Sequence, residues 1–180
     1  LWYTNDGGAT WATHTDGLPT LGVSAIAVDP YNPSVMYIGT GDRDAGDAPG
    51  VGIMKSTDGG VTWQSSNNGM GNKIVGGLII DPTNSQVLLA SSNSGIFKSV
   101  DGGANWVLKL GGGFKDIDFK PGDPNVVYAT QNGRFYRSAD AGESWENVVS
   151  AIPSGQHGVI AVTPANPEFV YFLLSKGDNS

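Results

Sequence analysis

Four near-copies of one eight-residue stretch constrain the fold of this chain more than any other feature. They begin at Thr4, Ser56, Ser99 and Ser138 and follow the pattern Ser/Thr-x-Asp-Gly/Ala-Gly-x-Thr/Asn/Ser-Trp. The Asp can accept hydrogen bonds from backbone N–H groups of its own turn. The glycine pair supplies the positive φ angles of a tight hairpin turn. The tryptophan opens the next strand with a large apolar ring. Each copy therefore predicts a β-hairpin, and the four together predict a repeated β architecture.

This stretch resembles the Asp box, the repeat of sialidases and related β-propellers. Families with such boxes include the xyloglucan-cleaving enzymes of glycoside hydrolase family 74, the sortilin-type receptors and a photosystem II assembly factor of plants and cyanobacteria. The resemblance implies that the box is a structural turn on the propeller rim and is not catalytic. The residues expected to have this structural role are Asp6, Trp11, Asp58, Trp63, Asp101, Trp106, Asp140 and Trp145.

A second repeat lies between the boxes and consists of an apolar strand, a turn rich in Pro, Asn and Asp, and another apolar strand. Its copies begin at Ile26, Leu78, Ile117 and Ile160. Proline after the first strand ends it, because proline has no N–H to donate to a ladder. Strand a precedes this turn, strand b follows it, strand c leads into the box and strand d starts at the tryptophan. A four-stranded repeat of about 40 residues is typical of a propeller blade.

The predicted fold is therefore an all-β propeller of four-stranded antiparallel blades. Complete blades are expected at 23–66, 74–109 and 114–149, with half blades at 1–13 and 159–174. The high content of glycine (27) and proline (10) fits an all-β chain with many turns. Either the two half blades complete a fourth blade and close a small ring, or the chain is part of a longer propeller. We favour the longer propeller, because the resembling families have six or more blades.

Tyr37, Tyr128 and Tyr171 recur at one position of strand b. Recurrence at a repeat position indicates packing within or between blades and argues against a platform for a sugar ring. Trp2 precedes the first box and is expected to pack in a strand c.

Composition limits the classes of partner. The net charge is −7 with only ten Lys and Arg, which argues against binding nucleic acid or an anionic membrane through a basic surface. No cysteine is present, so disulfide and thiolate chemistry are excluded, and no 18-residue apolar run predicts membrane insertion. The expected partners are the remaining blades, from the same or another chain, and a protein or glycan ligand.

Binding is expected on one face of the propeller. In a four-stranded meander the a–b and c–d turns share one face, and the variable b–c and d–a turns share the other.

In the first complete blade, 21 residues separate Tyr37 from Asp58, against 13 and 12 in the next two blades. The surplus is an acidic b–c loop, 41–50. Its Asp42, Asp44 and Asp47 are candidate calcium ligands. Their spacing is not that of an EF-hand, and a solvated loop with an Arg43–Asp contact is the alternative.

The candidate ligand-binding residues are Asp42, Arg43, Asp44, Asp47 and His157. No catalytic residue is assigned. Asp42 loosely resembles, in its placement after a second strand, a catalytic carboxylate of the family 74 enzymes. Glycoside cleavage needs two carboxylates, and the sequence indicates no second one. A sialidase needs an arginine cluster, but only three arginines are present and the Phe/Tyr-Arg-Ile-Pro motif is absent.

Three functions are compatible with these observations. The first is a secreted or cell-surface propeller that is a non-catalytic binding or scaffold module for protein or glycan. The sequence pattern of the whole chain resembles that of the large exported repeat proteins of bacteria that are described as sortilin-like or glycosyl-hydrolase-like. The second is a polysaccharide hydrolase of the family 74 kind. The third is an assembly factor that binds another protein.

Overall fold

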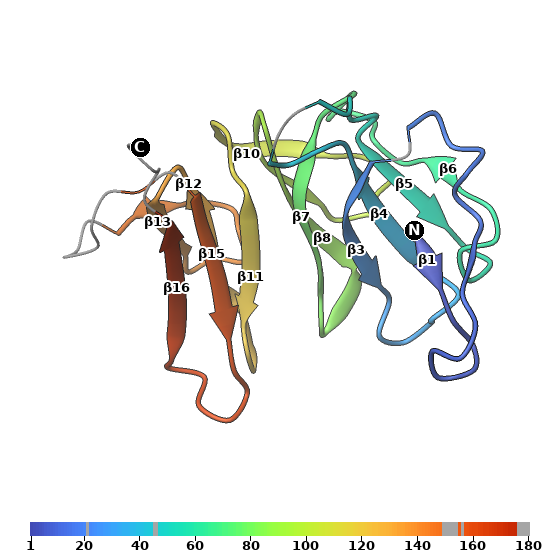
Figure 1. Ribbon diagram of the computed structural model, residues 1–180. Helices are drawn as coiled ribbons and strands as arrows, with labels where there is room; N and C mark the ends of the chain where they lie inside the picture. Colours follow the sequence, from blue (N-terminus) through green and yellow to red (C-terminus); the bar gives the residue numbers. More distant parts are fainter. Residues whose placement is uncertain (21, 45–46, 149–154, 156, 176–180) are drawn as a thin grey trace.

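The protein is all-β, as predicted. The computed structural model describes residues 1–20, 22–44, 47–148, 155 and 157–175, and these residues form sixteen strands and no helix (Figure 1). The strands are β1 (Trp2–Tyr3), β2 (Ala12–Thr13), β3 (Val23–Val28), β4 (Met36–Thr40), β5 (Ile53–Ser56), β6 (Gln64–Ser65), β7 (Val75–Asp81), β8 (Asn84–Ser92), β9 (Gly95–Ser99), β10 (Val107–Gly111), β11 (Asp116–Lys120), β12 (Asp123–Gln131), β13 (Arg134–Ser138), β14 (Glu146–Asn147), β15 (His157–Val162) and β16 (Val170–Ser175). No helix in this part of the chain has the length and apolarity to cross a membrane.

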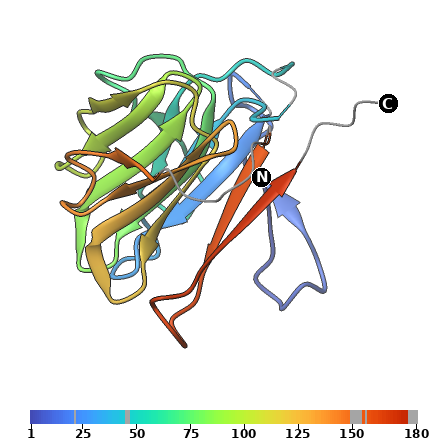
Figure 2. The ribbon, with the colours of Figure 1, turned by 90° about the vertical axis from the view of Figure 1, so that its left-hand side faces the viewer.

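The strands form three four-stranded antiparallel meanders and two hairpins. The first sheet is β3-β4-β5-β6, the second β7-β8-β9-β10 and the third β11-β12-β13-β14. The hairpins β1–β2 and β15–β16 form two-stranded sheets at the two ends of the described chain. The first strands of successive sheets lie side by side, with β3 against β7, β7 against β11 and β11 against β15 (Figures 1 and 2). This is the blade arrangement of a β-propeller, in which four-stranded sheets are placed around an axis.

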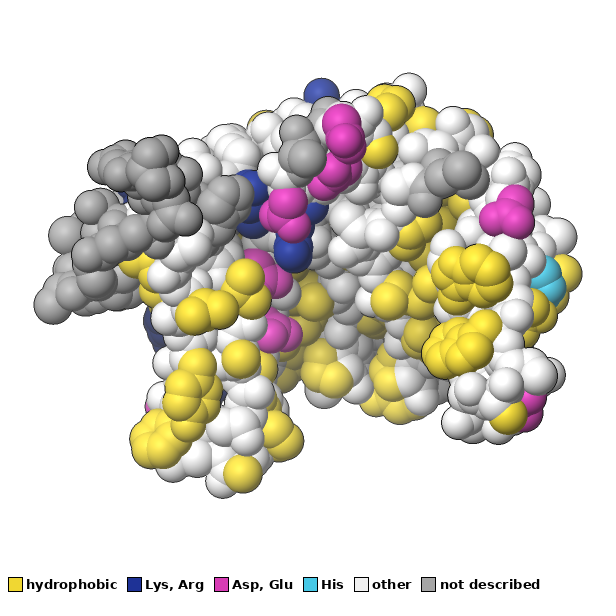
Figure 3. Space-filling view, in the orientation of Figure 1, with side chains coloured by type: hydrophobic (Ala, Val, Ile, Leu, Met, Phe, Trp, Pro, Cys, Tyr) yellow, Lys and Arg dark blue, Asp and Glu magenta, His cyan; other side chains and the backbone are white. Residues whose placement is uncertain are grey.

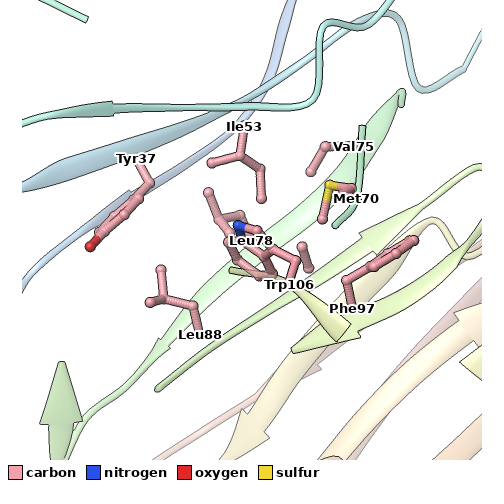
Figure 4. Close-up of a cluster of buried hydrophobic side chains, with 9 residues drawn as sticks. Tyr37, Ile53, Met70, Val75, Leu78, Leu88, Phe97 and Trp106 are labelled. Carbon is pink, nitrogen blue, oxygen red and sulfur yellow. The ribbon is translucent and has the colours of Figure 1, made fainter. Parts of the chain in front are cut away.

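The apolar core lies between the sheets. Alternating side chains of each strand face opposite sides, so the second and third sheets each pack on both neighbours. Tyr37 and Ile53 of the first sheet meet Leu88, Phe97 and Trp106 of the second (Figure 4). A second cluster joins the second and third sheets, and a third cluster joins the third sheet to β15–β16. The stability of each blade therefore depends on its neighbours.

The Asp-box turns connect the third and fourth strands of the sheets. In the first sheet the Asp58 carboxylate accepts hydrogen bonds from the Thr62 hydroxyl (2.6 Å), the Thr62 N–H (2.9 Å) and the Ser56 hydroxyl (2.7 Å). These bonds, with that of the Thr62 hydroxyl the largest, lower the pKa of Asp58 to about 2. The Gly59 N–H donates to the Ser34 carbonyl (2.9 Å) in the first turn of the same sheet. The a–b and c–d turns therefore share one face, as predicted.

The Asp-box turns of the second and third sheets also contact the preceding blade. The Gly102 carbonyl of the second sheet accepts hydrogen bonds from the Tyr37 hydroxyl (2.9 Å) and the Lys55 ammonium (2.8 Å) of the first sheet. The Trp106 indole N–H donates to the Ser66 carbonyl (2.8 Å). A Cβ on Gly103 would lie 2.8 Å from the Ser66 hydroxyl oxygen. Glycine is therefore required where the turn meets the neighbouring blade.

The third sheet repeats this contact with different chemistry. Glu143 of its Asp-box turn accepts hydrogen bonds from Lys98 (2.7 Å) and Lys109 (2.6 Å) of the second sheet. A Cβ on Gly142 would lie 2.7 Å from the Leu89 side chain. The turn thus fastens one blade to the next as well as closing its own hairpin.

Packing predictions for the aromatic residues hold in the interior of the array and fail at its ends. Tyr37 is 2% and Tyr128 is 6% exposed, as expected of packing residues. The expectation is wrong for Tyr171, which is 59% exposed because no described residue covers that side of β16. Trp2 lies in β1 but does not pack, and Trp11 is exposed as well.

Candidate ligand-binding face

The long loop of the first sheet is anchored at both ends. It spans residues 41–52 between β4 and β5. The Thr40 hydroxyl accepts a hydrogen bond from the Val51 N–H (2.8 Å) and donates one to the Gly52 carbonyl (2.7 Å). A Cβ on Gly50 would lie 2.1 Å from the Lys73 carbonyl oxygen, so glycine lets the loop pack against the turn before β7. Residues 45–46 of the loop lie outside the described residues.

The acidic part of the loop is folded on itself. The Asp42 carboxylate accepts a hydrogen bond from the Asp44 N–H (2.8 Å), and the Asp42 N–H donates to the Ala48 carbonyl (3.0 Å). Arg43 Nε lies 3.4 Å from the Asp44 carboxylate, which is the Arg–Asp contact expected from the sequence. Asp47 is exposed to solvent. The loop therefore presents Arg43 and Asp44 as a pair.

A lysine from the third sheet reaches this pair. Lys115, just before β11, donates a hydrogen bond to the Arg43 carbonyl (3.2 Å), and its ammonium lies 3.6 Å from the Asp44 carboxylate. Burial acts to raise the pKa of Asp44, but the hydrogen bonds and positive charges of Arg43 and Lys115 hold that pKa below its ordinary value. The loop of the first sheet is thereby tied to the start of the third.

Two pockets adjoin at Arg43. The larger, of about 380 Å³, is lined by Gly22, Val23, Ser24, Gly41, Asp42, Arg43, Asp44 and Ala48. The smaller, of about 130 Å³, is lined by Arg43, Ile74, Gly76, Asn93, Gly113, Phe114, Lys115 and Asn132. Their linings combine charged, amide and backbone groups from all three complete sheets. Acidic and basic side chains interleave in the upper middle of the face in Figure 3. We call these two pockets the Arg43 site.

The structure does not bring the three aspartates together as a cation site. Among the described residues, no group of three His, Cys, Asp or Glu side chains is placed to hold a metal ion. Asp42 is occupied by the turn of its own loop, and Asp44 by Arg43 and Lys115. Calcium binding by Asp42, Asp44 and Asp47 stays a prediction that this geometry does not support.

His157 begins β15, two residues before the start of the half blade expected at 159–174, and its backbone pairs with Ser175. Its side chain lies outside the described residues. The site expected from sequence is therefore described for Asp42, Arg43, Asp44 and Asp47 alone. Sequence reasoning missed Lys115, although it is the one charged residue at a position held elsewhere by Ser24, Gly76 and Gly158.

Two further acids were also missed. Asp116 and Asp118 of β11 occupy repeat positions that hold Ala25 and Ala27 in the first sheet. The Asp116 carboxylate accepts a hydrogen bond from the Ile160 N–H of β15 (2.7 Å). Burial first, and then the charge of Asp116, raise the pKa of Asp118 to about 6.

Asp118 lies in a different pocket from Asp42. Its pocket, of about 470 Å³, is formed by β3, β7, β11 and the turns that follow them. The acid that lines the pocket beside Asp42 is Asp44, on the same loop. The described pockets therefore do not show an opposed pair of carboxylates around Asp42.

Known proteins resemble this chain in fold and, over part of it, in sequence. No protein-family model matches it. A xyloglucanase from Paenibacillus sp. is 32% identical over 82 residues, which are 41% of this chain and 8% of the xyloglucanase. The crystal structure of an ancestral GH74 enzyme superposes with a TM-score of 0.71 at 22% identity, covering 84% of this chain and 21% of that enzyme.

Two other superpositions support the same fold. The GH74 enzyme of Niastella koreensis matches with a TM-score of 0.58 at 25% identity, covering 79% of this chain and 24% of that enzyme. YCF48 bound to D1 peptide matches with a TM-score of 0.56 at 18% identity, covering 82% of this chain and 47% of YCF48. This chain thus spans less than half the length of each protein. The superpositions establish the propeller fold.

Proposed function

We propose that this chain supplies a non-catalytic glycan-binding face to a propeller, with the Arg43 site as the point of contact. The observation that carries the proposal is the junction of Arg43, Asp44 and Lys115, where side chains of the first and third sheets meet between two open pockets. Such polar groups on a rigid scaffold fix the orientation of a ligand. The similarity to a xyloglucanase favours a β-glucan such as xyloglucan as the ligand.

Binding is tested by titrating the chain calorimetrically with xyloglucan oligosaccharides. Lys115 and Lys120 lie at opposite ends of one strand, and each is partly buried and ion-paired. Lys115→Ala and Arg43→Ala should weaken binding about tenfold or more, whereas Lys120→Ala should leave it unchanged. Equal losses in the two lysine variants, or no binding by the wild type, would contradict the proposal.

The second candidate is hydrolysis of a xyloglucan-like polysaccharide by the whole protein. It is favoured by the sequence similarity to a xyloglucanase and by the fold shared with GH74 enzymes. Asp42 is the acid on the variable face that would take part. A glycosidase needs a second carboxylate about 5–9.5 Å away across the substrate, and the described pockets place Asp118 elsewhere.

Incubation with xyloglucan and measurement of new reducing ends separates the two candidates. We expect no product from these 180 residues. Product that disappears in Asp42→Asn, with the melting temperature unchanged, would establish the hydrolase.

A polysaccharide ligand also places the protein outside the cell or on its surface, which is the localisation we propose. A protein ligand is the other partner class, since YCF48 was solved with a bound peptide on the same fold.

A further inference from the structure

A polar pocket of about 450 Å³ lies between the first and second sheets. The first sheet contributes Lys55 of β5, Gln64 of β6 and both ends of its Asp-box turn. The second sheet contributes Gly102 and Ala104 of its own Asp-box turn. None of the residues that line this pocket lines either pocket of the Arg43 site. It is therefore a separate cavity, which we call the Lys55 pocket.

The same junction between the second and third sheets holds a carboxylate. Lys98 of β9 has the repeat position of Lys55. Glu143 of the third-sheet Asp-box turn has the repeat position of Ala104. The Glu143 carboxylate accepts hydrogen bonds from Lys98 (2.7 Å) and Lys109 (2.6 Å), and the bond from Lys109, then that from Lys98, lowers its pKa below the ordinary value. One blade further on, the chain thus shows which chemical group this junction holds.

The Lys55 pocket lacks that carboxylate, because Ala104 stands where the third sheet has Glu143. Among the described residues, no carboxylate forms an ion pair with Lys55. The Lys55 ammonium is partly buried and donates a hydrogen bond to the Gly102 carbonyl (2.8 Å). This bond uses one of the three N–H donors of an ammonium group. The pocket therefore has a cation with donors left for a ligand.

The Asp-box acids beside the pocket do not exclude an anion from it. Asp58 accepts three hydrogen bonds within its own turn, and Asp101 accepts three within its own. Asp101 and Asp140 have the same two positions around the junction that holds Glu143. A further carboxylate is therefore compatible with a pair of Asp-box acids.

Uncharged polar groups surround Lys55 in the pocket. Ser66 has the repeat position of Lys109, so the second cation of the Glu143 junction is replaced by a hydroxyl. The Thr57 hydroxyl and the Gln64 side-chain amide are exposed and make no hydrogen bond with other described residues. Hydroxyl and amide groups donate and accept, as the ring hydroxyls of a sugar do. The pocket volume lies within the usual range for small-molecule sites, about 300–1,000 Å³.

We propose that the Lys55 pocket binds an acidic sugar, such as a uronic acid residue of a polysaccharide. Its carboxylate takes the place of Glu143 and accepts a hydrogen bond from the Lys55 ammonium. Thr57 and Gln64 bind the ring hydroxyls. This ligand differs from the neutral β-glucan proposed for the Arg43 site, and the two sites bind independently. Because one exposed or partly buried ion pair contributes little, a single sugar residue should bind with a dissociation constant of about a millimolar.

Glucuronic acid and glucose are the test pair, because they differ only in the carboxylate at the sixth carbon. Each is titrated into the ¹⁵N-labelled 180-residue chain, and binding is measured from the shifts of the backbone amide signals. Glucuronate should shift the amides at 55–57, 62–68 and 102–104, which surround the pocket, and glucose should bind about tenfold more weakly or not at all. N-acetylglutamate tests whether the pocket prefers the side chain of an acidic peptide.

Ala104→Glu supplies an internal competitor, because it places a carboxylate at the position of Glu143. The new side chain should pair with Lys55 and weaken glucuronate binding about tenfold or more. Val61→Glu is the matched control, since Val61 has the same position in the first Asp-box turn, is exposed and lies outside the pocket lining. It adds the same charge and should leave binding unchanged.

Lys55→Gln should also abolish glucuronate binding, and Arg43→Ala should not affect it, which separates this site from the Arg43 site. Ala104→Glu keeps the test decisive if Lys55→Gln fails to fold. Three results would overturn the proposal. These are equal binding of glucose and glucuronate, tighter binding of N-acetylglutamate than of glucuronate, and undiminished glucuronate binding by Ala104→Glu.

Discussion

Two successive positions of the Asp-box turns need glycine for different physical reasons. The first requires a positive φ but has open space, because a Cβ on Gly59 (φ 74°) would meet nothing within 4 Å. The second has a positive φ and also faces the preceding blade at Gly103 and Gly142. The third sheet places Ala141 at the first position with a φ of 56°. An alanine is tolerated there because its methyl group has room.

Ala141→Gly should therefore stabilise the protein. The substitution relieves the left-handed strain of an L-residue and gains about 0.5–1 kcal/mol in the free energy of unfolding, after the greater chain entropy of glycine is allowed for. Gly103→Ala is the matched control and should destabilise, since its Cβ would lie 3.0 Å from the Tyr37 ring. Urea unfolding of both variants gives the two free energies. A less stable Ala141→Gly would contradict this explanation of the turn.

Asp118 should make stability depend on pH between about 4 and 6. Its pKa in the folded state is about 6, above the ordinary value of 3.8, so the folded state binds its proton more tightly. The resulting stabilisation is present below about pH 4 and is lost as pH rises through 6; it amounts to about 1–2 kcal/mol once solvent screening is allowed for. Asp118→Asn should abolish this pH dependence and be more stable than wild type at pH 7, measured by urea unfolding across the range. A steeper pH dependence in Asp118→Asn would rule out this role.

At the scale of the element, the Asp-box hairpin is the unit that fastens blade to blade. Its carboxylate orders the turn, its glycines admit the neighbouring side chains and its tryptophan enters the cluster between sheets. Trp106 is nearly fully buried and donates its N–H to the Ser66 carbonyl of the preceding sheet. The hairpin therefore contributes to the stability of two blades.

Trp106→Ala should cost about 3–5 kcal/mol, because it leaves a cavity between two sheets. Trp11→Ala is the control, since that ring is exposed and its loss should change the free energy of unfolding by less than about 0.5 kcal/mol. Urea unfolding of the two variants and the wild type measures both free energies. Similar losses at the two positions would show that burial between blades is not the cause.

At the scale of the whole molecule, the repeats made the fold predictable from the sequence. The candidate site was not predictable in the same way, because it depends on contacts between blades. Four boxes and four Pro turns were enough to predict four-stranded blades, and the shared face of the a–b and c–d turns followed from the meander. The long loop of the first sheet stood out by its length. Its contact with Lys115 did not, because that contact joins two residues 72 positions apart in the sequence and is set by tertiary packing.

At the ends of the row of sheets, the repeat position of a residue does not predict its burial. Tyr171 has the same repeat position as Tyr37 and was expected to pack, but packing there requires a neighbour that the described residues do not include. Asp116 and Asp118 were likewise overlooked because the strand reads as a Pro-turn hairpin like the others. Aligning the four units position by position would have revealed two acids where the first sheet has alanines.

Hydrogen exchange with and without xyloglucan oligosaccharides shows most directly whether the variable face binds glycan, because it reports where on the propeller a ligand binds. Binding at the Arg43 site should protect backbone amides at 41–44 and 113–115, which line its two pockets. The Asp-box turns at 57–62 and 101–105 lie on the opposite face, and their exchange should not change. Protection confined to the Asp-box turns, or absent throughout at saturating oligosaccharide, would contradict the claim that the variable face binds glycan.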